Sequence, residues 1–270
     1  MITLLFLALS GHPVAKKPEW TFDPAKLETA MKATDHRLET VSAVFVGAPY
    51  GFSPLGEGEG FDKDPLYRTD LFDCLTFVET SMALALAKSP GEVTPELSKI
   101  RYGGDKAAYA ERNHVMEAQW VPANEKKGVI EDVTAKIAGK DVVKVTKKLD
   151  DAAWSAKTAK TLKLPHDAEA RGNFSWDIVP ADKALEHLKS APDGTIVTVV
   201  RADRPTLVTR ISHVGILIHV NGEPYLRHAS KSYGKVVEEP LAHYLERNLE
   251  YAKWTVEGFG LYALTGRATK

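Results

Sequence analysis

The sequence predicts an α+β fold in which a helix that begins at the only cysteine packs against an antiparallel β-sheet. Three patterns lead to this prediction. Apolar side chains recur at helical spacing from Cys74 to about residue 88. Residues 195–200 form a continuous β-branched run, which is typical of a strand. Residues 213–220 and 223–230 alternate on either side of an Asn-Gly pair, which is typical of a hairpin.

Composition sets the broad class of the protein. The chain has 270 residues, of which 44% are hydrophobic, enough for one domain with a sizeable core. A formal net charge of -1 does not favour nucleic acid as a partner. The single cysteine excludes an internal disulfide, and the nine histidines show no H-x-x-x-H or H-E-x-x-H spacing. We therefore expect neither a metal site nor a cofactor.

An apolar run opens the chain. Residues 2–9 are apolar apart from Thr3, and small residues follow up to Ala15. This pattern predicts a secretory signal peptide over residues 1–15, too short to span a membrane, although no basic residue precedes the run. An N-terminal strand or buried segment is the alternative. Residues 20–270 are then expected to form a single domain with a middle insertion at about 89–190 and no integral membrane segment.

The next two segments lead to the cysteine. Asp23 is a helix cap and Pro24 suits a first helical position, so we expect one helix over residues 23–38. Residues 47–69 are rich in glycine and proline and are expected to form a loop that contains Tyr50.

The cysteine lies at the predicted start of its helix. Asp70 or Asp73 can cap this helix, which leaves Cys74 in the first turn. Unpaired backbone N–H groups and the helix dipole stabilise a thiolate at such a position. The alternative is a buried cysteine that acts as a small hydrophobic residue, and only partners elsewhere in the chain can decide between the two.

The middle of the chain shows weaker patterns. Three prolines interrupt residues 89–134, which are expected to be irregular. Eight lysines lie between Lys136 and Lys163, and a solvated helical face is the simplest interpretation. A short helix is expected over residues 181–190. Beyond the hairpin we expect a strand at Val236-Val237, a helix over 240–248 and a closing strand over 254–264.

The hairpin carries two histidines. Alternation puts His213, Gly215, Leu217 and His219 on one face of the first strand. With a two-residue turn, Gly215 pairs with His228, so that His213 and His228 become diagonal neighbours on one face. A four-residue turn would keep this facing and an odd-length loop would break it, and Pro224 leaves the turn length open.

A cysteine at a helix start and two histidines on a later hairpin provide the nucleophile, base and orienting group of a papain-like site. The motifs D-C-L-T-F-V-E, H-V-G-I and R-H-A-S resemble the NlpC-type cell-wall cysteine peptidases, specifically their N-acetylmuramoyl-L-alanine amidase-like branch. The resemblance covers roughly residues 40–265 as scattered motifs. Further agreement lies in Gly47-Ala48-Pro49-Tyr50, Arg101-Tyr102-Gly103-Gly104, Tyr109, Arg112, His114, Trp120, Asn124, Gly128 and Asp132-Val133-Thr134.

The resemblance implies a papain-like catalytic domain, exported to the bacterial periplasm or cell envelope, with peptidoglycan or muropeptides as substrate. The expected reaction is hydrolysis of the amide between N-acetylmuramic acid and L-alanine. Cys74 would attack the lactyl carbonyl as a thiolate, His213 would carry the proton, and His228 would fix the tautomer of His213. The same resemblance suggests Tyr50, Asp73, Arg112 and His114 as substrate-binding residues, with Tyr50 lining the cleft or donating to the oxyanion.

Three different functions stay open at the level of sequence. The first is a γ-D-glutamyl-diamino acid endopeptidase of the same superfamily, in which Asp73 would hold the free ammonium of L-alanine. The second is a cell-wall binding module without activity, which is disfavoured because Cys74, His213 and His228 are all present. The third is an acyltransferase of the wider fold family, against which the predicted export and the long middle segment argue.

Overall fold

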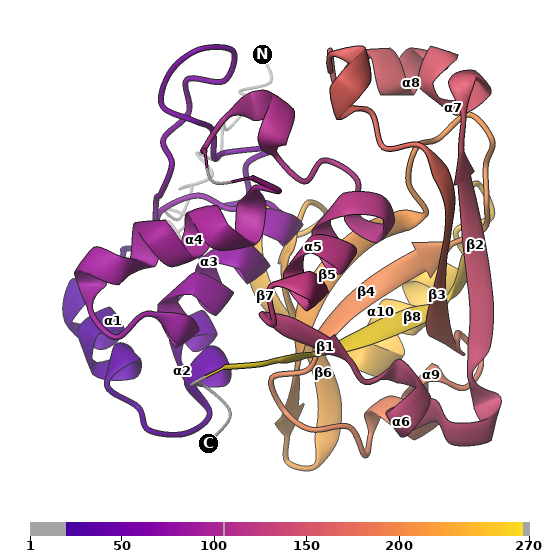
Figure 1. The fold of residues 1–270 in the computed structure, drawn as a ribbon. Coiled ribbons are helices and arrows are strands. Elements are labelled where there is room, and N and C mark those ends of the chain that lie inside the picture. The colour runs from indigo at the N-terminus through magenta and orange to yellow at the C-terminus, as the bar shows by residue number, and fades with distance from the viewer. Residues whose placement is uncertain (1–19, 105, 267–270) are drawn as a thin grey trace, which may run out of the picture.

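The computed structural model describes residues 20–104 and 106–266, and it has a mixed α/β fold around one antiparallel sheet (Figure 1). The sheet has eight strands in the order β2-β3-β8-β4-β5-β6-β7, and β1 also pairs with β8. The strands are β1 (Ile130–Asp132), β2 (Val143–Leu149), β3 (Gly172–Pro180), β4 (Ile196–Arg201), β5 (Ile211–Val220), β6 (Glu223–Ser230), β7 (Lys235–Pro240) and β8 (Val256–Leu264). The predicted fold class, an antiparallel sheet with a helix that begins at the cysteine, is thus present.

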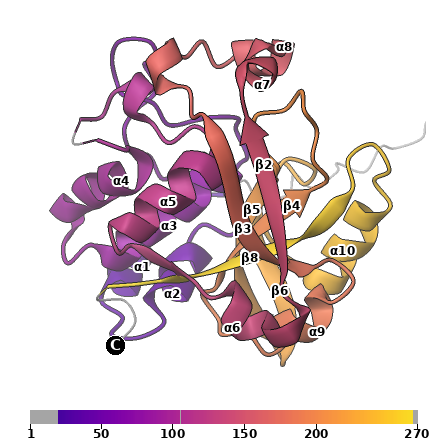
Figure 2. The same cartoon turned by 45° about the vertical axis from the view of Figure 1, so that its right-hand side comes forward.

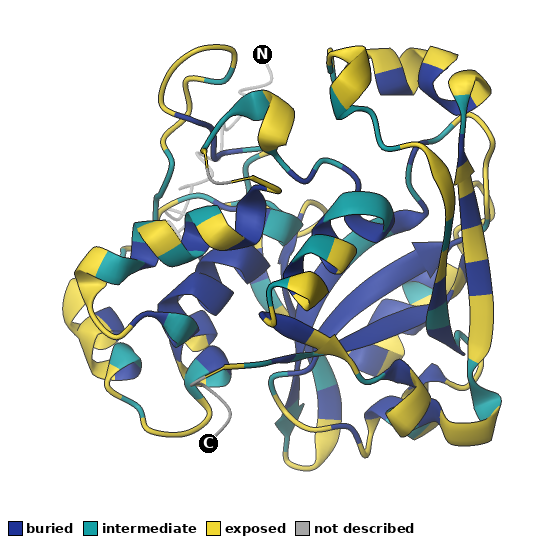
Figure 3. Ribbon diagram, viewed as in Figure 1, coloured by how far each residue is buried: buried dark blue, intermediate teal, exposed yellow. Residues whose placement is uncertain are grey.

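Helices cover both faces of this sheet (Figure 2). The α-helices are α1 (Pro24–Met31), α2 (Arg37–Ala43), α3 (Cys74–Leu86), α4 (Val93–Arg101), α5 (Val121–Lys126), α6 (Thr134–Ala138), α7 (Asp151–Ser155), α8 (Lys157–Lys160), α9 (Ala184–Leu188) and α10 (Leu241–Leu249). Helices α1 to α5 share one apolar core with the sheet, and α6, α9 and α10 share another on the opposite face. Figure 3 shows the central strands and α3 as almost wholly buried.

Strand β5 divides its side chains between these two cores. Val214, Ile216 and Ile218 belong to the core that contains α3, whereas Leu217 packs with the core around α10. The start of β5 contains an irregularity, because Val199 pairs with His213 but Val200 pairs with Ile211. Ser212 is therefore an extra residue on β5, as in a β-bulge.

The hairpin of β5 and β6 has the two-residue turn that the sequence allows. Val220 pairs with Glu223 and Ile216 with Arg227. Asn221 and Gly222 both have positive φ, 54° and 81°, as a type I′ turn requires. The predicted register is therefore confirmed, and Pro224 does not lengthen the turn.

The segment before the cysteine differs from the expectation of one helix over residues 23–38. Helix α1 begins as predicted, with Asp23 accepting from the N–H groups of Ala25 and Lys26 and with Pro24 in its first turn. It ends at Met31, and α2 starts only after His36, whose φ of 47° is left-handed and incompatible with a continuous helix.

The expectation that residues 89–134 are irregular is wrong. Two α-helices, α4 and α5, lie there, together with a π-helical turn over Met116–Trp120. Pro90, Pro95 and Pro122 all fall within the first turn of a helical element, where the missing proline N–H has no intrahelical role. The prolines lie in the first turns of these helices and do not break them.

The lysine-rich segment is also different from its prediction as a helical face. Residues 143–149 form β2, which pairs along its whole length with β3. Val145, Lys147 and Leu149 point to the buried side in strict alternation. Lys147 is buried because its ammonium group contacts Asp203 at 2.6 Å and the carbonyl oxygen of Arg204 at 2.8 Å. A charged side chain that is paired in this way can occupy a core position of the alternating pattern.

The last third of the chain agrees with the predictions. Strand β4, strand β7, helix α10 and strand β8 lie where the sequence indicates, and α9 is the core of the helix expected over 181–190. Within the described residues, no helix has the length and apolar character needed to cross a membrane. The signal peptide predicted over residues 1–15 lies outside the described residues, and the division into domains stays a prediction.

The close pairing of β8 with β3 gives a test of the fold. A methyl group on Gly258 would collide with the carbonyl oxygen of Val179 and lie 2.7 Å from Cδ1 of Ile178. We expect Gly258→Ala to lower the free energy of unfolding by about 1–3 kcal/mol, as overpacking does. Gly91→Ala is the control, since its methyl group would meet nothing closer than 4.0 Å, and it should change stability by less than about 0.5 kcal/mol. Urea unfolding of both variants checks this, and equal stabilities would contradict the packing.

Candidate active site

Asp73 begins the cysteine helix. Its Oδ1 accepts a hydrogen bond from the Thr76 N–H at 2.8 Å, and its own N–H donates to the Thr76 hydroxyl at 2.9 Å. This capping box places Cys74 at the first residue of α3. Asp70, the other predicted cap, instead pairs with Arg68 at 2.9 Å.

The same carboxylate ties α3 to the preceding loop. The N–H of Ser53 donates to Asp73 Oδ2 at 3.0 Å, and the N–H of Gly51 donates to the carbonyl oxygen of Phe72 at 2.9 Å. Tyr50 is held from the other side, because its N–H donates to the carbonyl oxygen of Gly234 at 2.9 Å. Tyr50 is therefore fixed between the turn that follows β6 and the residues that lead into Cys74.

Cys74 is half-buried, and its surroundings act on the sulfur in opposite directions. Burial, followed by the charge of Asp73, raises the pKa of the Cys74 thiol to about 12. The backbone N–H groups of Val214, Leu75 and Cys74 face the sulfur and lower this pKa, but less strongly. The helix start alone therefore does not maintain a thiolate, contrary to the sequence-based expectation, and the resting group is a thiol.

The two hairpin histidines are in contact, as the register predicts. His213 Nε2 lies 2.7 Å from His228 Nδ1, and the two rings are nearly perpendicular, with centroids 4.8 Å apart. Tyr244 of α10 lies parallel to the His213 ring and perpendicular to the His228 ring. Burial and the neighbouring His228 lower the pKa of His213 well below its usual value, so the resting ring is neutral.

A buried carboxylate continues this chain of contacts. His228 Nε2 lies 3.1 Å from Glu239 Oε2, and Arg247 donates to both oxygens of Glu239 at 2.7 Å. Burial by itself would raise the pKa of Glu239, but the hydrogen bonds from Arg247 and His228 outweigh it and lower the pKa to about 2. Glu239 is therefore ionised throughout the physiological range.

The charge of Glu239 fixes the tautomers of both rings. A carboxylate only accepts hydrogen bonds, so Nε2 of His228 must be the protonated nitrogen. Nδ1 of the neutral His228 is then an acceptor, and Nε2 of His213 must donate to it. This leaves Nδ1 of His213 without a proton. The arrangement can therefore provide a base at His213 whose lone pair lies on the ring nitrogen away from His228.

The structure brings the cysteine and the histidine strand together through the backbone. The N–H that faces the Cys74 sulfur belongs to Val214, the residue directly after His213. Among the contacts of the described residues there is no hydrogen bond between the Cys74 thiol and the His213 ring. Catalytic hydrogen bonds are often long in an enzyme without substrate and shorten when substrate binds, so this geometry is compatible with a nucleophile and base pair.

Arg112 and His114 hold a different region. Arg112 contacts Glu57 at 2.6 Å and Asp62 at 2.9 Å, and its guanidinium lies over the Tyr109 ring. His114 donates from Nε2 to the carbonyl oxygen of Tyr109 at 2.6 Å, and burial lowers its pKa to about 4. Both side chains thus stabilise the segment around residues 57–62, and none of their described contacts includes Cys74 or His213.

Other aromatic and basic residues near this region are structural. Trp120 is fully buried and donates to Glu79 at 2.9 Å, and Arg101 pairs with the same carboxylate at 2.6 Å. Both side chains are buried beside α3 and have a structural role there.

Sequence reasoning missed Glu239, Tyr244 and Arg247. The available signal was the alternation along β7, which neighbours β6 in the sheet, but an acidic residue at the end of a strand is common at surfaces. Glu239 is only 2% exposed because α10 folds back over the hairpin, and no local sequence pattern indicates this.

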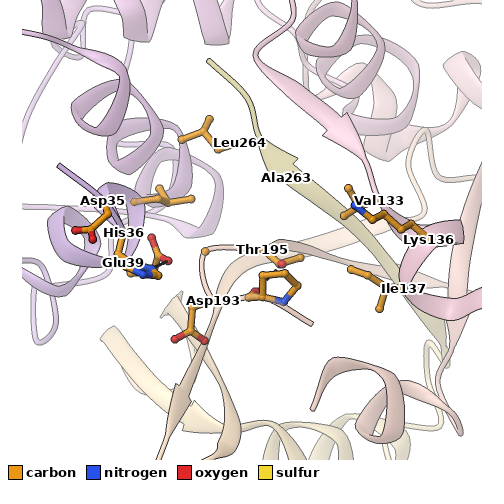
Figure 4. Close-up of a pocket in the computed structure, with 13 residues that line it drawn as sticks. Asp35, His36, Glu39, Val133, Lys136, Ile137, Asp193, Thr195, Ala263 and Leu264 are labelled. Atoms are coloured by element: carbon orange, nitrogen blue, oxygen red, sulfur yellow. Dashed lines mark hydrogen bonds and ion pairs between the residues drawn. The ribbon is translucent and has the colours of Figure 1, made fainter. Parts of the chain in front are cut away.

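One pocket lies beside the histidines, and a larger one lies elsewhere on the molecule. The first has a volume of about 250 Å³ and is lined by His213, His228, Tyr244 and Arg247 among others. Figure 4 shows a different pocket, of about 440 Å³, in which Asp35, His36 and Glu39 face Val133, Lys136 and Ile137 across Thr195. Neither Cys74 nor either histidine of the hairpin lines that second pocket.

Comparison with known proteins identifies similar chains. A family model described as N-acetylmuramoyl-L-alanine amidase-like matches residues 40–251. A crystal structure of a Legionella pneumophila protein of the DUF1460 family has a TM-score of 0.78 and 26% identity, covering 89% of this chain and 92% of that one. Among curated proteins, none matches this sequence.

Two structures from Bacteroides are also similar. An N-acetylmuramoyl-L-alanine amidase from Bacteroides uniformis has a TM-score of 0.67 at 21% identity, covering 88% of this chain and 100% of that one. A Bacteroides fragilis protein provisionally named a xylanase has a TM-score of 0.66 at 26% identity, covering 83% of this chain and 98% of that one. The fold is therefore shared along nearly the whole length of these proteins.

Alkylation of Cys74 tests its protonation state. Because the raised pKa keeps the group as a thiol, iodoacetamide should react slowly near neutral pH, and the rate should still be rising above about pH 9. Mass spectrometry over time measures the rate, and the protein unfolded in urea, with a thiol pKa of about 8.5, is the reference. A rate in the folded protein that levels off below pH 7 would instead demonstrate a resident thiolate.

Proposed function

This chain belongs to the N-acetylmuramoyl-L-alanine amidase-like family, and from that premise we propose that it is a peptidoglycan hydrolase that uses Cys74 to cleave the amide between N-acetylmuramic acid and L-alanine. The observation that carries the proposal is the chain of contacts from His213 through His228 to Glu239, which begins next to the backbone N–H that faces the Cys74 sulfur. In this proposal Cys74 is the nucleophile, His213 the base and His228 the orienting group.

The reaction begins from a neutral thiol and a neutral imidazole. Nδ1 of His213 takes the thiol proton as the sulfur attacks the lactyl carbonyl carbon, which gives a tetrahedral oxyanion. The protonated His213 then gives this proton to the nitrogen of L-alanine as the C–N bond breaks, and a thioester with Cys74 remains. Water hydrolyses the thioester with His213 again acting as base. The negative charge of Glu239 stabilises the imidazolium that forms in both steps.

Tyr50 and the start of α3 are suited to the oxyanion. Burial, followed by the charges of Cys74 and Asp73, raises the pKa of Tyr50 to about 12, so its hydroxyl keeps its proton. A protonated hydroxyl beside the cysteine can donate a hydrogen bond, together with the backbone N–H of Cys74. Arg112 and His114, proposed from sequence as substrate-binding residues, would then act mainly by holding the segment around residues 57–62.

The arrangement supports a papain-like site of the NlpC type. The cysteine begins a helix that packs on the strands carrying the histidines, and the order of these elements along the chain is cysteine, histidine, orienting group. The proposal includes export to the cell envelope through the signal peptide predicted at residues 1–15, since peptidoglycan lies outside the cytoplasm.

Asp73 favours the amidase over the endopeptidase reaction. An endopeptidase of this superfamily would use the carboxylate to bind the ammonium group of L-alanine. Here Oδ1 already accepts from the N–H and hydroxyl of Thr76, and Oδ2 accepts from the N–H of Ser53. These bonds occupy most of the acceptor capacity of a carboxylate. A substrate whose L-alanine nitrogen is acylated requires no such ammonium site.

A binding module and a glycosidase both have less support. A binding module would gain nothing from a buried chain of two histidines and a carboxylate, which costs desolvation energy. A xylanase would use two carboxyl groups, one of them protonated as an acid. Glu239, with its pKa lowered to about 2, cannot fill that role.

Defined muropeptides test the reaction. The protein with residues 1–15 removed is incubated with muropeptides in the presence of a chelator, beside Cys74→Ala, and the products are identified by mass spectrometry. We expect free stem peptide and an intact sugar from the wild type only, because the variant lacks the nucleophile. Hydrolysis by Cys74→Ala would eliminate the mechanism. Cleavage after D-glutamate would assign the endopeptidase reaction instead.

Glu239→Gln tests the role of the carboxylate as a positioning residue. A glutamine amide can donate to Nε2 of His228, which would reverse both tautomers and put a proton on Nδ1 of His213. We expect kcat to fall on the order of 10²- to 10⁴-fold. The acidic limb of the pH profile should move to lower pH, because the Glu239 charge raises the pKa of both histidines.

Glu238→Gln is the matched control for this prediction. Glu238 is the neighbouring residue on β7 and pairs with Arg227 at 2.6 Å, away from the histidines. Its replacement should leave both kcat and the pH profile unchanged. If Glu239→Gln behaved in the same way, while circular dichroism showed both variants folded, Glu239 would have only a structural role.

A further inference from the structure

The pocket beside the histidines contains a buried cation without an acidic partner. Arg201, at the end of β4, is 8% exposed and lines this pocket together with His213. Its guanidinium donates to the Ser212 hydroxyl at 2.8 Å, to the side-chain oxygen of Asn248 at 2.9 Å and to the carbonyl oxygen of Trp254. All three acceptors are uncharged. Among the described residues, no carboxylate forms an ion pair with Arg201.

A buried charge without a counter-ion is unfavourable, and proteins normally pair such charges. The pocket increases this imbalance, because Lys231 and Arg247 also line it and no aspartate or glutamate does. Of these two cations, Arg247 is already neutralised by its ion pair with Glu239. Three of the five N–H groups of Arg201 are used in the contacts above, which leaves two for a ligand. The rings of Tyr251 and Trp254, each 5.6 Å from the guanidinium, hold its plane in place.

The position of the pocket indicates which part of a substrate it receives. His213 lines it, whereas Cys74 does not, and in the proposed reaction this ring returns the proton to the leaving nitrogen of L-alanine. The leaving peptide must therefore lie on the side of His213, and its next residue reaches about 3.8 Å further along the backbone. That residue is D-glutamate linked through its γ-carboxyl group, so its α-carboxylate is free.

We propose that the pocket lined by Arg201 binds the free α-carboxylate of D-glutamate in the stem peptide, on the leaving-group side of the scissile amide. The proposal rests on the proposed amidase function for the orientation of the substrate. The guanidinium of Arg201 donates its remaining N–H groups to the carboxylate, and the substrate thereby supplies the missing counter-ion. Peptides with this carboxylate converted to a carboxamide are then poor substrates.

Binding of the leaving peptide tests this assignment separately from catalysis. Isothermal titration of the wild-type protein is carried out with L-alanyl-γ-D-glutamyl peptide and with the same peptide bearing an α-carboxamide. We expect about 10- to 100-fold tighter binding of the carboxylate form, as for hydrogen bonds to a charged group. Equal affinity for the two peptides, or no binding of either, would overturn the inference whatever the hydrolysis assay shows. Preference for the carboxylate without any hydrolysis of muropeptides would refute the amidase function instead and leave the pocket assignment in place.

Two variants assign the preference to Arg201. Arg201→Gln should bring the affinity ratio of the two peptides close to 1, and Arg201→Lys should retain part of it because the charge remains. Arg204→Gln is the control, since Arg204 is exposed, lies over the same Trp254 ring and does not line the pocket. If Arg201→Gln does not fold, the affinity ratio of the two peptides is compared between the wild type and Arg201→Lys, and a ratio that does not fall in Arg201→Lys contradicts the assignment. An unchanged ratio in folded Arg201→Gln would contradict the assignment.

Discussion

The register of the β5–β6 hairpin is the constraint on which the site depends. A two-residue turn at Asn221 and Gly222 fixes which residues of the two strands lie opposite each other. His213 and His228 meet at 2.7 Å only in that register, and a slip of one residue would move one of them to the face that packs on α3. The positive φ of both turn residues, which suits asparagine and glycine, therefore determines the geometry of side chains some eight residues away.

Charge is distributed unequally around this hairpin. Next to His228, Glu239 and Arg247 neutralise each other, and Glu239 orients the two rings. In the pocket that Arg247 also lines, Arg201 has only neutral acceptors. The Glu239–Arg247 ion pair thus holds the histidines in their orientation. The charge of Arg201 has no acidic partner among the described residues and can attract an anionic ligand. The Asp73 carboxylate also serves geometry, because it accepts hydrogen bonds from Thr76 and Ser53 within the chain.

Local patterns predicted the parts of the fold that depend on near neighbours. The cap at Asp23, the start of α3 and the hairpin all follow from a few adjacent residues, and all are present. The prediction for the middle of the chain was wrong because Pro95 and Pro122 lie in the first turns of helices, where sequence alone does not distinguish them from prolines that interrupt a helix. Strand β2 was not predicted because the burial of Lys147 depends on Asp203, which lies more than fifty residues away in the sequence. Glu239 and Arg201 were missed for the same reason, since their partners lie on α10 and in the segment that follows it.

The extra residue in β5 has a consequence for how the chain can vary in length. His213 and Ile211 would face the same way in a regular strand, yet Ile211 belongs to the core beside α3 while His213 packs against Tyr244 of α10. The bulge at Ser212 therefore separates the register of the histidines from that of everything before them. From Ile216 to Arg227 the pairing of the hairpin is regular, so a one-residue change of length within β5 or β6 would turn one histidine toward the core beside α3.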